Sequence, residues 1–239
     1  MSEGGEATAA DTAVASETPR EIVAALLVLT FTTGIVDAVS LLGLGPAFVA
    51  NQTGNVLLLG FAIAGASGFT VAATLVSLAG FVVGIAAGGL IGRERRNGVA
   101  GWMKPALAIE IALLAAAAAL AVGVDLGDGD ELRRHAAIAL LAAAMGLRNA
   151  AVRDLRVIDL TTTTVVSMTM TGLLSDSARE GAKGPNLVRR GGAVATMLIG
   201  AVAGALLTLH ADAAVGLAVA AACALVSLAL VLRAVAPGR

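Results

Sequence analysis

The chain has 239 residues, of which 58% are apolar and only 14% are charged, against roughly 25% in ordinary soluble domains. Its mean hydropathy of +0.90 is too high for a water-soluble core, and its apolar runs have the length of about 20 residues that a bilayer core requires of a helix. The net charge of −1 excludes a basic surface for nucleic acid. One cysteine, Cys223, excludes an internal disulfide, and His135 and His210 lie far apart, so we expect neither a metal site nor a cofactor. The composition predicts an all-α, multi-pass integral membrane protein that is not an enzyme.

Residues 1–20 are small, polar and acidic, and they contain no basic region followed by an apolar stretch. This pattern differs from that of a cleaved signal peptide and predicts a disordered cytoplasmic tail. From Glu21 onward the sequence contains eight apolar segments. They cover residues 21–43, 47–66, 69–91, 105–124, 135–151, 160–175, 191–209 and 213–235.

Two of the eight segments are more polar than the others. The segment 47–66 contains the run Asn51-Gln52-Thr53-Gly54-Asn55, and the segment 160–175 is rich in threonine and contains Thr171-Gly172. Either segment could cross the membrane if its polar residues were tolerated there. Length alone therefore does not decide between a crossing and a re-entrant segment.

The Lys and Arg residues of the loops favour the re-entrant alternative under the positive-inside rule. If all eight segments cross, nine Lys and Arg residues lie inside and seven outside, which is no bias. If the two polar segments enter and leave on one side, fourteen lie inside, and only Arg133 and Arg134 lie outside. The charges thus predict about six crossings with both termini in the cytoplasm. Basic loops flank the segment 160–175 on both sides, whereas the flanks of 47–66 carry no charge.

An internal repeat supplies the argument for 47–66. The run Gly34-Ile35-Val36-Asp37-Ala38 returns 112 positions later as Gly146-Leu147-Arg148-Asn149-Ala150. Gly80, Gly84, Gly88 and Gly92 correspond at the same offset to Gly192, Thr196, Gly200 and Gly204, and Thr53-Gly54 corresponds to Thr171-Gly172 at an offset of 118. Chance similarity between Gly- and Ala-rich helices is the alternative explanation.

The repeat divides the chain into two membrane halves. Residues 21–124 form the first repeat, 125–134 an external acidic loop and 135–239 the second repeat. Each half contains three crossing helices and one short re-entrant or broken polar segment. Because three is an odd number, the halves are inverted, which is an architecture of secondary transporters.

Two stretches resemble the signature of the YoaK-type family of bacterial membrane proteins, which is classed as a domain of unknown function. They are GIVDAVSLLGLGPAFVANQTGNVLLLG (34–60) and GLRNAAVRDLRVIDLTTTTVVSMTMTGLLSD (146–176). The resemblance covers nearly the whole chain after residue 20, and it implies an integral membrane protein with about six crossings, without implying a substrate. The second motif reads Thr171-Gly172-Leu173 where the first reads Thr53-Gly54-Asn55, so the two halves are not equivalent at this point.

Asp37 lies within the first predicted crossing, where a carboxylate costs about 2.5–3.5 kcal/mol on insertion scales. It is either a proton or cation site or a structural hydrogen-bond acceptor for the nearby polar run, and the sequence favours neither. Its counterpart Asn149 is uncharged, which argues against a symmetric pair of carboxylates.

The two polar runs are the best candidates for a solute site. Backbone that bends inside a membrane must line a cavity or be buried in protein, and glycine allows the turn. We therefore predict that a solute binds between the halves. The predicted binding residues are Asp37, Asn51, Thr53, Gly54, Asn55, Asn149, Thr169, Thr171 and Gly172.

Two further charges occur within predicted crossings. Arg148 lies near the cytoplasmic end of its segment, where the commoner outcome is a side chain that extends to the interface, and anion binding is the alternative. Glu110 lies close to the start of its segment, and we expect it to pair with Lys104 or Arg96.

Together these features predict a small-solute transporter of the bacterial cytoplasmic (inner) membrane. Its partners would be the lipid bilayer, a small solute and a second copy bound through Gly-rich helix faces. The alternative is a non-transporting assembly or stress component that acts through helix–helix contacts. An enzyme acting on lipid is disfavoured because no catalytic dyad converges in the sequence.

Overall fold

The computed structural model describes residues 19–93, 98–124, 130–154 and 185–235. These residues form seven α-helices and one π-helical turn, and they contain no strand. Six of these helices are long and apolar enough to cross a membrane, by length and composition. The prediction of an all-α, multi-pass membrane protein is therefore confirmed.

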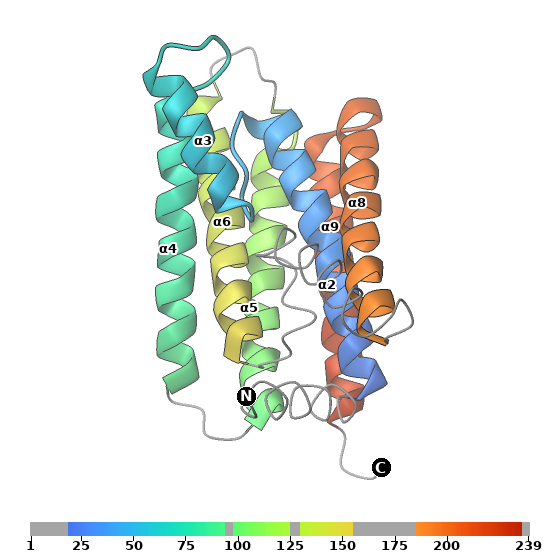
Figure 1. The fold of residues 1–239 in the computed structure, drawn as a ribbon. Helices are drawn as coiled ribbons and strands as arrows, with labels where there is room; N and C mark the ends of the chain where they lie inside the picture. Colours follow the sequence, from blue (N-terminus) through green and yellow to red (C-terminus); the bar gives the residue numbers. More distant parts are fainter. Residues whose placement is uncertain (1–18, 94–97, 125–129, 155–184, 236–239) are drawn as a thin grey trace, which may run out of the picture.

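The helices follow the predicted apolar segments in chain order (Figure 1). The first helix continues into the π-helical turn, and the next helix is short. The elements are α2 (Arg20–Val39), η1 (Ser40–Leu44), α3 (Gln52–Ile63), α4 (Val71–Arg93), α5 (Gly98–Ala121), α6 (Glu131–Asp154), α8 (Pro185–His210) and α9 (Ala213–Ala234). The predicted segment 160–175 lies outside the described residues.

Several helices begin earlier than the apolar pattern predicts. Helix α6 begins at Glu131, so the last four residues of the predicted external loop 125–134 are helical. The carbonyl of Asp130 accepts a hydrogen bond from the Arg134 N–H at 3.0 Å, and Glu131 stands in the first turn. A carboxylate is favourable there because the N-terminus of a helix carries partial positive charge. Counting only apolar residues misses such polar first turns.

Helices α2 and α6 occupy the centre of the bundle. In their most apolar stretches 67% and 61% of the residues are buried, against 17–33% in the other four spanning helices. Helix α2 packs mainly against α8 and α9, whereas α6 packs mainly against α4 and α5, and α5 and α9 contact each other. Each central helix therefore packs on helices from the other half of the sequence.

The outer helices α4 and α8 present apolar side chains to the surroundings. Val82 and Val83 on α4 are each 63% exposed, and Leu198 and Ile199 on α8 are 64% and 60% exposed. Such a surface suits hydrocarbon rather than water, so lipid contact follows from the fold.

Glycines allow the central and outer helices to approach closely. A Cβ on Gly84 of α4 would collide with the carbonyl oxygen of Ala143 on α6. A Cβ on Gly200 of α8 would collide in the same way with the carbonyl oxygen of Phe31 on α2. These glycines therefore serve close helix packing within the chain.

Helix α3 is too short to cross a bilayer. Its 12 residues span about 18 Å at 1.5 Å per residue, against a hydrocarbon core of about 30 Å. It packs against α4. In Figure 1 it lies at the end of the bundle where α2 ends and α4 begins.

Candidate functional site

The segment 45–51, which joins η1 to α3, is held by Asp37 on α2. The Asp37 side chain is only 6% exposed, and its Oδ1 accepts hydrogen bonds from the N–H groups of Val49 at 2.8 Å and Ala50 at 2.7 Å. The segment begins at Gly45, whose φ of 146° is a conformation that L side chains rarely adopt. Of the two roles open to Asp37, the structural hydrogen bond is therefore present.

Asn55 satisfies the backbone of the same segment from the first turn of α3. Its side chain is fully buried, its Oδ1 accepts from the Phe48 N–H at 2.9 Å, and its Nδ2 donates to the Phe48 carbonyl at 2.7 Å. Nδ2 also lies 2.8 Å from Gln52 Oε1 and 3.1 Å from Ser77 Oγ on α4. One amide thus replaces the backbone partners that a non-helical segment lacks inside a bundle.

Asn51, Thr53 and Gly54 stand at the N-terminus of α3. Asn51 caps the helix, because its Oδ1 accepts from the Gly54 N–H at 3.2 Å. A Cβ on Gly54 would lie 2.7 Å from the Phe48 ring, so this position requires close approach. The side chains of Asn51 and Thr53 are exposed.

The structure therefore brings part of the predicted site together. The segment 45–51 ends at Asn51 and is contacted by Asp37, Gly54 and Asn55. The binding role of these four residues stays a prediction. Asn149 lies on α6, beside Arg148. The predicted residues Thr169, Thr171 and Gly172 lie outside the described part of the chain.

A second polar cluster joins α5, α6 and α2. The Arg148 Nε lies 3.0 Å from Glu110 Oε2, and its Nη2 donates to Glu110 Oε1. Its Nη1 donates to the carbonyl of Leu29 and to Thr33 Oγ1, both at 2.8 Å. Arg148 is 3% exposed and Glu110 is 1% exposed. The pair is fully enclosed by the bundle.

This pair corrects two expectations. Arg148 does not extend to the interface, and Glu110 forms its ion pair with Arg148 rather than with Lys104. Arg96 lies outside the described residues. Helical side chains tilt toward the N-terminus of their helix, so Arg148, near the end of α6, is directed back toward the middle of the bundle. One signal in the sequence could have found the pair. Glu110 is the only charged residue in the predicted segment 105–124 and Arg148 the only one in 135–151, and such charges are paired inside membranes.

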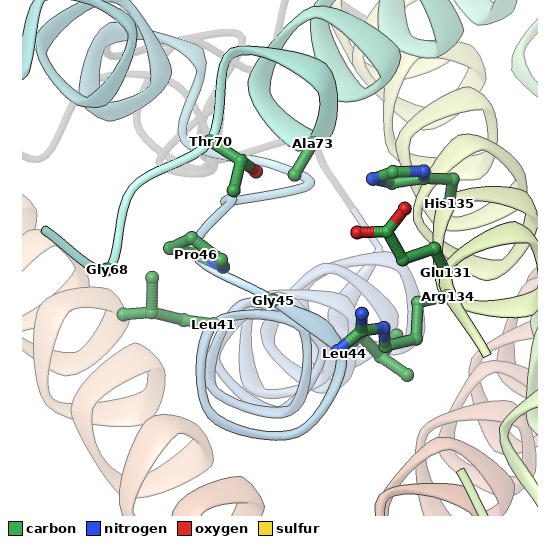
Figure 2. A pocket seen from close by; sticks show the side chains of 10 residues that line it. All are labelled: Leu41, Leu44, Gly45, Pro46, Gly68, Thr70, Ala73, Glu131, Arg134 and His135. Atoms are coloured by element: carbon green, nitrogen blue, oxygen red, sulfur yellow. The ribbon is translucent and has the colours of Figure 1, made fainter. Parts of the chain in front are cut away.

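A cavity of about 390 Å³ opens where α2 ends and α6 begins. Figure 2 shows Glu131 and His135 side by side on α6, opposite Pro46 and Thr70. The other residues that line the cavity are Leu41, Leu44, Gly45, Gly68, Ala73 and Arg134. Among the described residues, no group of three His, Cys, Asp or Glu side chains could hold a metal ion.

Comparisons with known proteins agree with this membrane architecture. Residues 25–231 match the model of the family "Protein of unknown function (DUF1275)". The UPF0700 transmembrane protein YoaK of Bacillus subtilis (strain 168) is 33% identical over 154 residues, and the match covers 63% of this chain and 65% of that relative. No solved structure matches the chain.

The family match begins within α2 and ends within α9, so it includes four of the six helices that are long enough to cross a membrane in full and most of the other two. The resemblance to the YoaK-type family is therefore confirmed. The chain belongs to the DUF1275 family of membrane proteins.

Proposed function

We propose that the protein is a carrier for a small solute in the cytoplasmic membrane, built from two inverted repeats with both termini in the cytoplasm. The solute binds between the repeats, and no enzymatic step is involved. The observation that carries the proposal is the buried Arg148–Glu110 pair, which joins the first half of the chain to the second. Ionisable residues inside a membrane protein mark solute or ion pathways more often than they mark simple packing.

The depth of this pair supports the proposal. Glu110 lies about 12 Å along α5 from Trp102 and about 16 Å from Ala121, the two ends of the candidate span, at 1.5 Å per residue. Thr33, which also binds Arg148, lies one residue past the middle of the span Arg20–Leu44. Secondary transporters bind their solutes near this depth, at the interface of their repeats.

Helix packing supports an inverted repeat. The packing of α2 against α8 and α9 has a counterpart in the packing of α6 against α4 and α5, and the equivalent helices α5 and α9 contact each other. When two similar halves are related by a two-fold axis, each central helix is expected to pack on the equivalent helices of the other half.

The close contacts refine the register of this repeat. A Cβ on Gly34 would collide with the Met197 carbonyl, and a Cβ on Gly146 would collide with the Phe81 carbonyl. The two glycines are 112 positions apart, but their partners are 116 apart. The glycines of α4 and α8 therefore correspond at 116 rather than at 112, as a short insertion between the first and later helices requires.

The segment 45–51 with α3 is the re-entrant element of the first repeat in this proposal. Asp37 and Thr33 are four residues apart and share one face of α2, so one polar stripe leads from Arg148 to this segment. Asp37 is the proposed coupling group, and the residues Asn51, Thr53, Gly54 and Asn55 face the solute together with the corresponding tract Thr169–Gly172 and Asn149.

Flux measurements in proteoliposomes test the proposal. The purified protein is reconstituted and assayed with a panel of neutral, cationic and anionic small solutes, and uptake of at least one of them above protein-free vesicles is expected. Absence of uptake across the panel, together with a stoichiometric partner that copurifies, contradicts the proposal and favours an assembly component.

The variant Asp37→Asn separates a coupling role from a structural one. The N–H groups of Val49 and Ala50 both donate to Oδ1, which an asparagine retains. We expect the variant to fold and to lose gradient-driven uptake. Asp212→Asn is the matched control, because Asp212 caps α9 through Oδ1 at 2.9 Å and asparagine caps equally well. Unchanged uptake in Asp37→Asn would remove Asp37 from the mechanism.

A further inference from the structure

The guanidinium of Arg148 is fixed by two separate sets of contacts. Its Nη1 donates to the Leu29 carbonyl and to Thr33 Oγ1, both on α2. Its Nε and Nη2 together face the two carboxylate oxygens of Glu110. The contacts with α2 would therefore hold the guanidinium in place if the carboxylate of Glu110 moved away.

The edge of Arg148 that faces Glu110 is the edge that recognises carboxylates in general. Two parallel N–H groups match two oxygens of a planar oxyanion, which is the geometry of Arg–carboxylate recognition. Glu110 thus occupies a site whose shape and charge suit a small monovalent carboxylate.

We propose that Glu110 is an internal stand-in for an anionic solute, and that its protonation lets a small monocarboxylate take its place on Arg148. This inference rests on the proposed carrier function and names the solute class and the coupling ion. It also replaces Asp37 by Glu110 as the group that carries the coupling proton. In the resting state, Arg148 carries one positive charge and Glu110 one negative charge. In the loaded state, Glu110 is protonated and neutral, and the bound anion balances Arg148.

The exchange keeps the buried pair neutral in both states, so one proton enters with one anion. The intermediate with protonated Glu110 and an empty Arg148 leaves one uncompensated positive charge inside the membrane and is disfavoured. Strict coupling of one proton to one anion follows from this charge balance.

The other charged groups near this pair are few among the described residues. Away from the helix ends, the helices α2, α5, α6 and α9 carry Asp37 and Cys223 as further ionisable side chains. Lys104, Arg153 and Arg233 lie closer to helix ends. Asp37 does not replace Glu110 on the Arg148 edge, because its Oδ1 binds Val49 and Ala50.

Proteoliposomes loaded with a pH-sensitive dye test the inference with lactate, pyruvate and nitrate as probes. An inward proton gradient is expected to accelerate uptake of these anions, and their uptake is expected to acidify the lumen. Where Glu110 is mostly ionised, the apparent affinity for the probe falls about tenfold for each unit rise in pH, because only the protonated fraction is competent to bind. Uptake of a neutral or cationic solute without competition by the three anions overturns this inference and leaves the carrier proposal intact, whereas absence of any uptake overturns both.

The variant Glu110→Gln gives the sharpest readout. It leaves Arg148 free of its internal anion, so binding of lactate and nitrate becomes tighter and independent of pH, and proton movement stops while anion exchange persists. Asp130→Asn is the matched control, since its surface pair with Arg133 lies at a helix end. If the binding of lactate and nitrate to Glu110→Gln still depends on pH, the proposal is contradicted.

Wild-type protein provides a readout that does not depend on how the variants fold. Stabilisation of the purified protein against heat by nitrate or lactate is expected to decrease as pH rises. Stabilisation that does not change with pH contradicts the proposal. The double variant Glu110→Gln/Arg148→Gln, which removes both charges, is expected to show no stabilisation by either anion.

Discussion

Asp37 and Ala50, thirteen positions apart, meet where the carboxylate of Asp37 accepts a hydrogen bond of 2.7 Å from the Ala50 N–H. Val49 donates to the same oxygen at 2.8 Å. Because all three residues are buried, neither N–H group has water as an alternative partner. The carboxylate is therefore the support of the segment 45–51.

Substitution of this carboxylate should destabilise the protein in a graded way. Asp37→Ala leaves two buried N–H groups unpaired, at a cost of about 1–3 kcal/mol each. Asp37→Asn keeps the accepting oxygen and should lose much less. Thermal unfolding of purified protein in detergent measures the difference, and equal melting temperatures for the two variants would contradict the expected role.

The effect of Gly54→Ala on stability should change sign when Phe48 is also substituted, which a double-mutant cycle measures. In the wild type, Gly54→Ala forces a methyl group to within 2.7 Å of the Phe48 ring, which should cost about 1–3 kcal/mol. In a Phe48→Leu background the ring contact is removed, and Asn51 Nδ2 at 3.2 Å is the close neighbour that remains. Alanine should then stabilise the first turns of α3 by up to about 1 kcal/mol because of its helix propensity. Denaturation of the four proteins under one condition gives the coupling, and additive effects would argue against the contact.

Two glycines of α4 form a matched pair for testing helix packing. A Cβ on Gly84 would collide with the Ala143 carbonyl, whereas a Cβ on Gly89 would have no atom of the protein within 4 Å. Gly84→Val should therefore lower the melting temperature strongly, and Gly89→Val should leave it nearly unchanged. Similar losses at both sites would show that the valine itself, rather than the contact with α6, causes the effect.

The buried ion pair should be destabilised more by one substitution than by two. Glu110→Met leaves Arg148 buried without its counter-charge, which typically costs about 3–5 kcal/mol. Glu110→Met/Arg148→Met removes both charges and should recover most of that loss. Unfolding in detergent provides the comparison, and a double variant less stable than the single one would contradict this account.

Cysteine labelling tests the orientation that the loop charges predict. In a Cys223→Ala background, cysteines introduced as Val157→Cys and Ser177→Cys should react with a membrane-impermeant reagent from the cytoplasmic side. Ser67→Cys, between α3 and α4, should react from the outside. If Val157→Cys and Ser177→Cys report opposite sides, the segment 160–175 crosses the membrane and is not re-entrant.

The sequence predicts the helices well because a bilayer imposes a length that apolar runs reveal directly. The boundaries are less accurate where polar first turns extend a helix, as at Glu131. The hydrogen bonds of Asp37 were foreseeable as one of two alternatives, since a carboxylate in a membrane needs a partner. The sequence does not predict which N–H groups Asp37 binds, because Val49 and Ala50 contribute only backbone groups.

The ion pair between Arg148 and Glu110 cannot be predicted from the sequence for a different reason. The two residues lie 38 positions apart on different helices, and their pairing depends on how α5 and α6 are rotated against each other. The sequence favours the nearby Lys104 as the ion-pair partner of Glu110, because it reveals only which residues are close along the chain.

Each central helix packs on helices from the other half of the chain, and this has a consequence for biosynthesis. The most extensive packing of α2 is against α8 and α9, which a ribosome makes some 165 residues after α2 begins. During most of translation, α2 lacks its final helix neighbours, and Thr33 lacks its hydrogen-bond partner Arg148. Truncated nascent chains that end before α8 should therefore be bound by membrane chaperones or degraded, and the complete chain should escape only after its last hairpin is inserted.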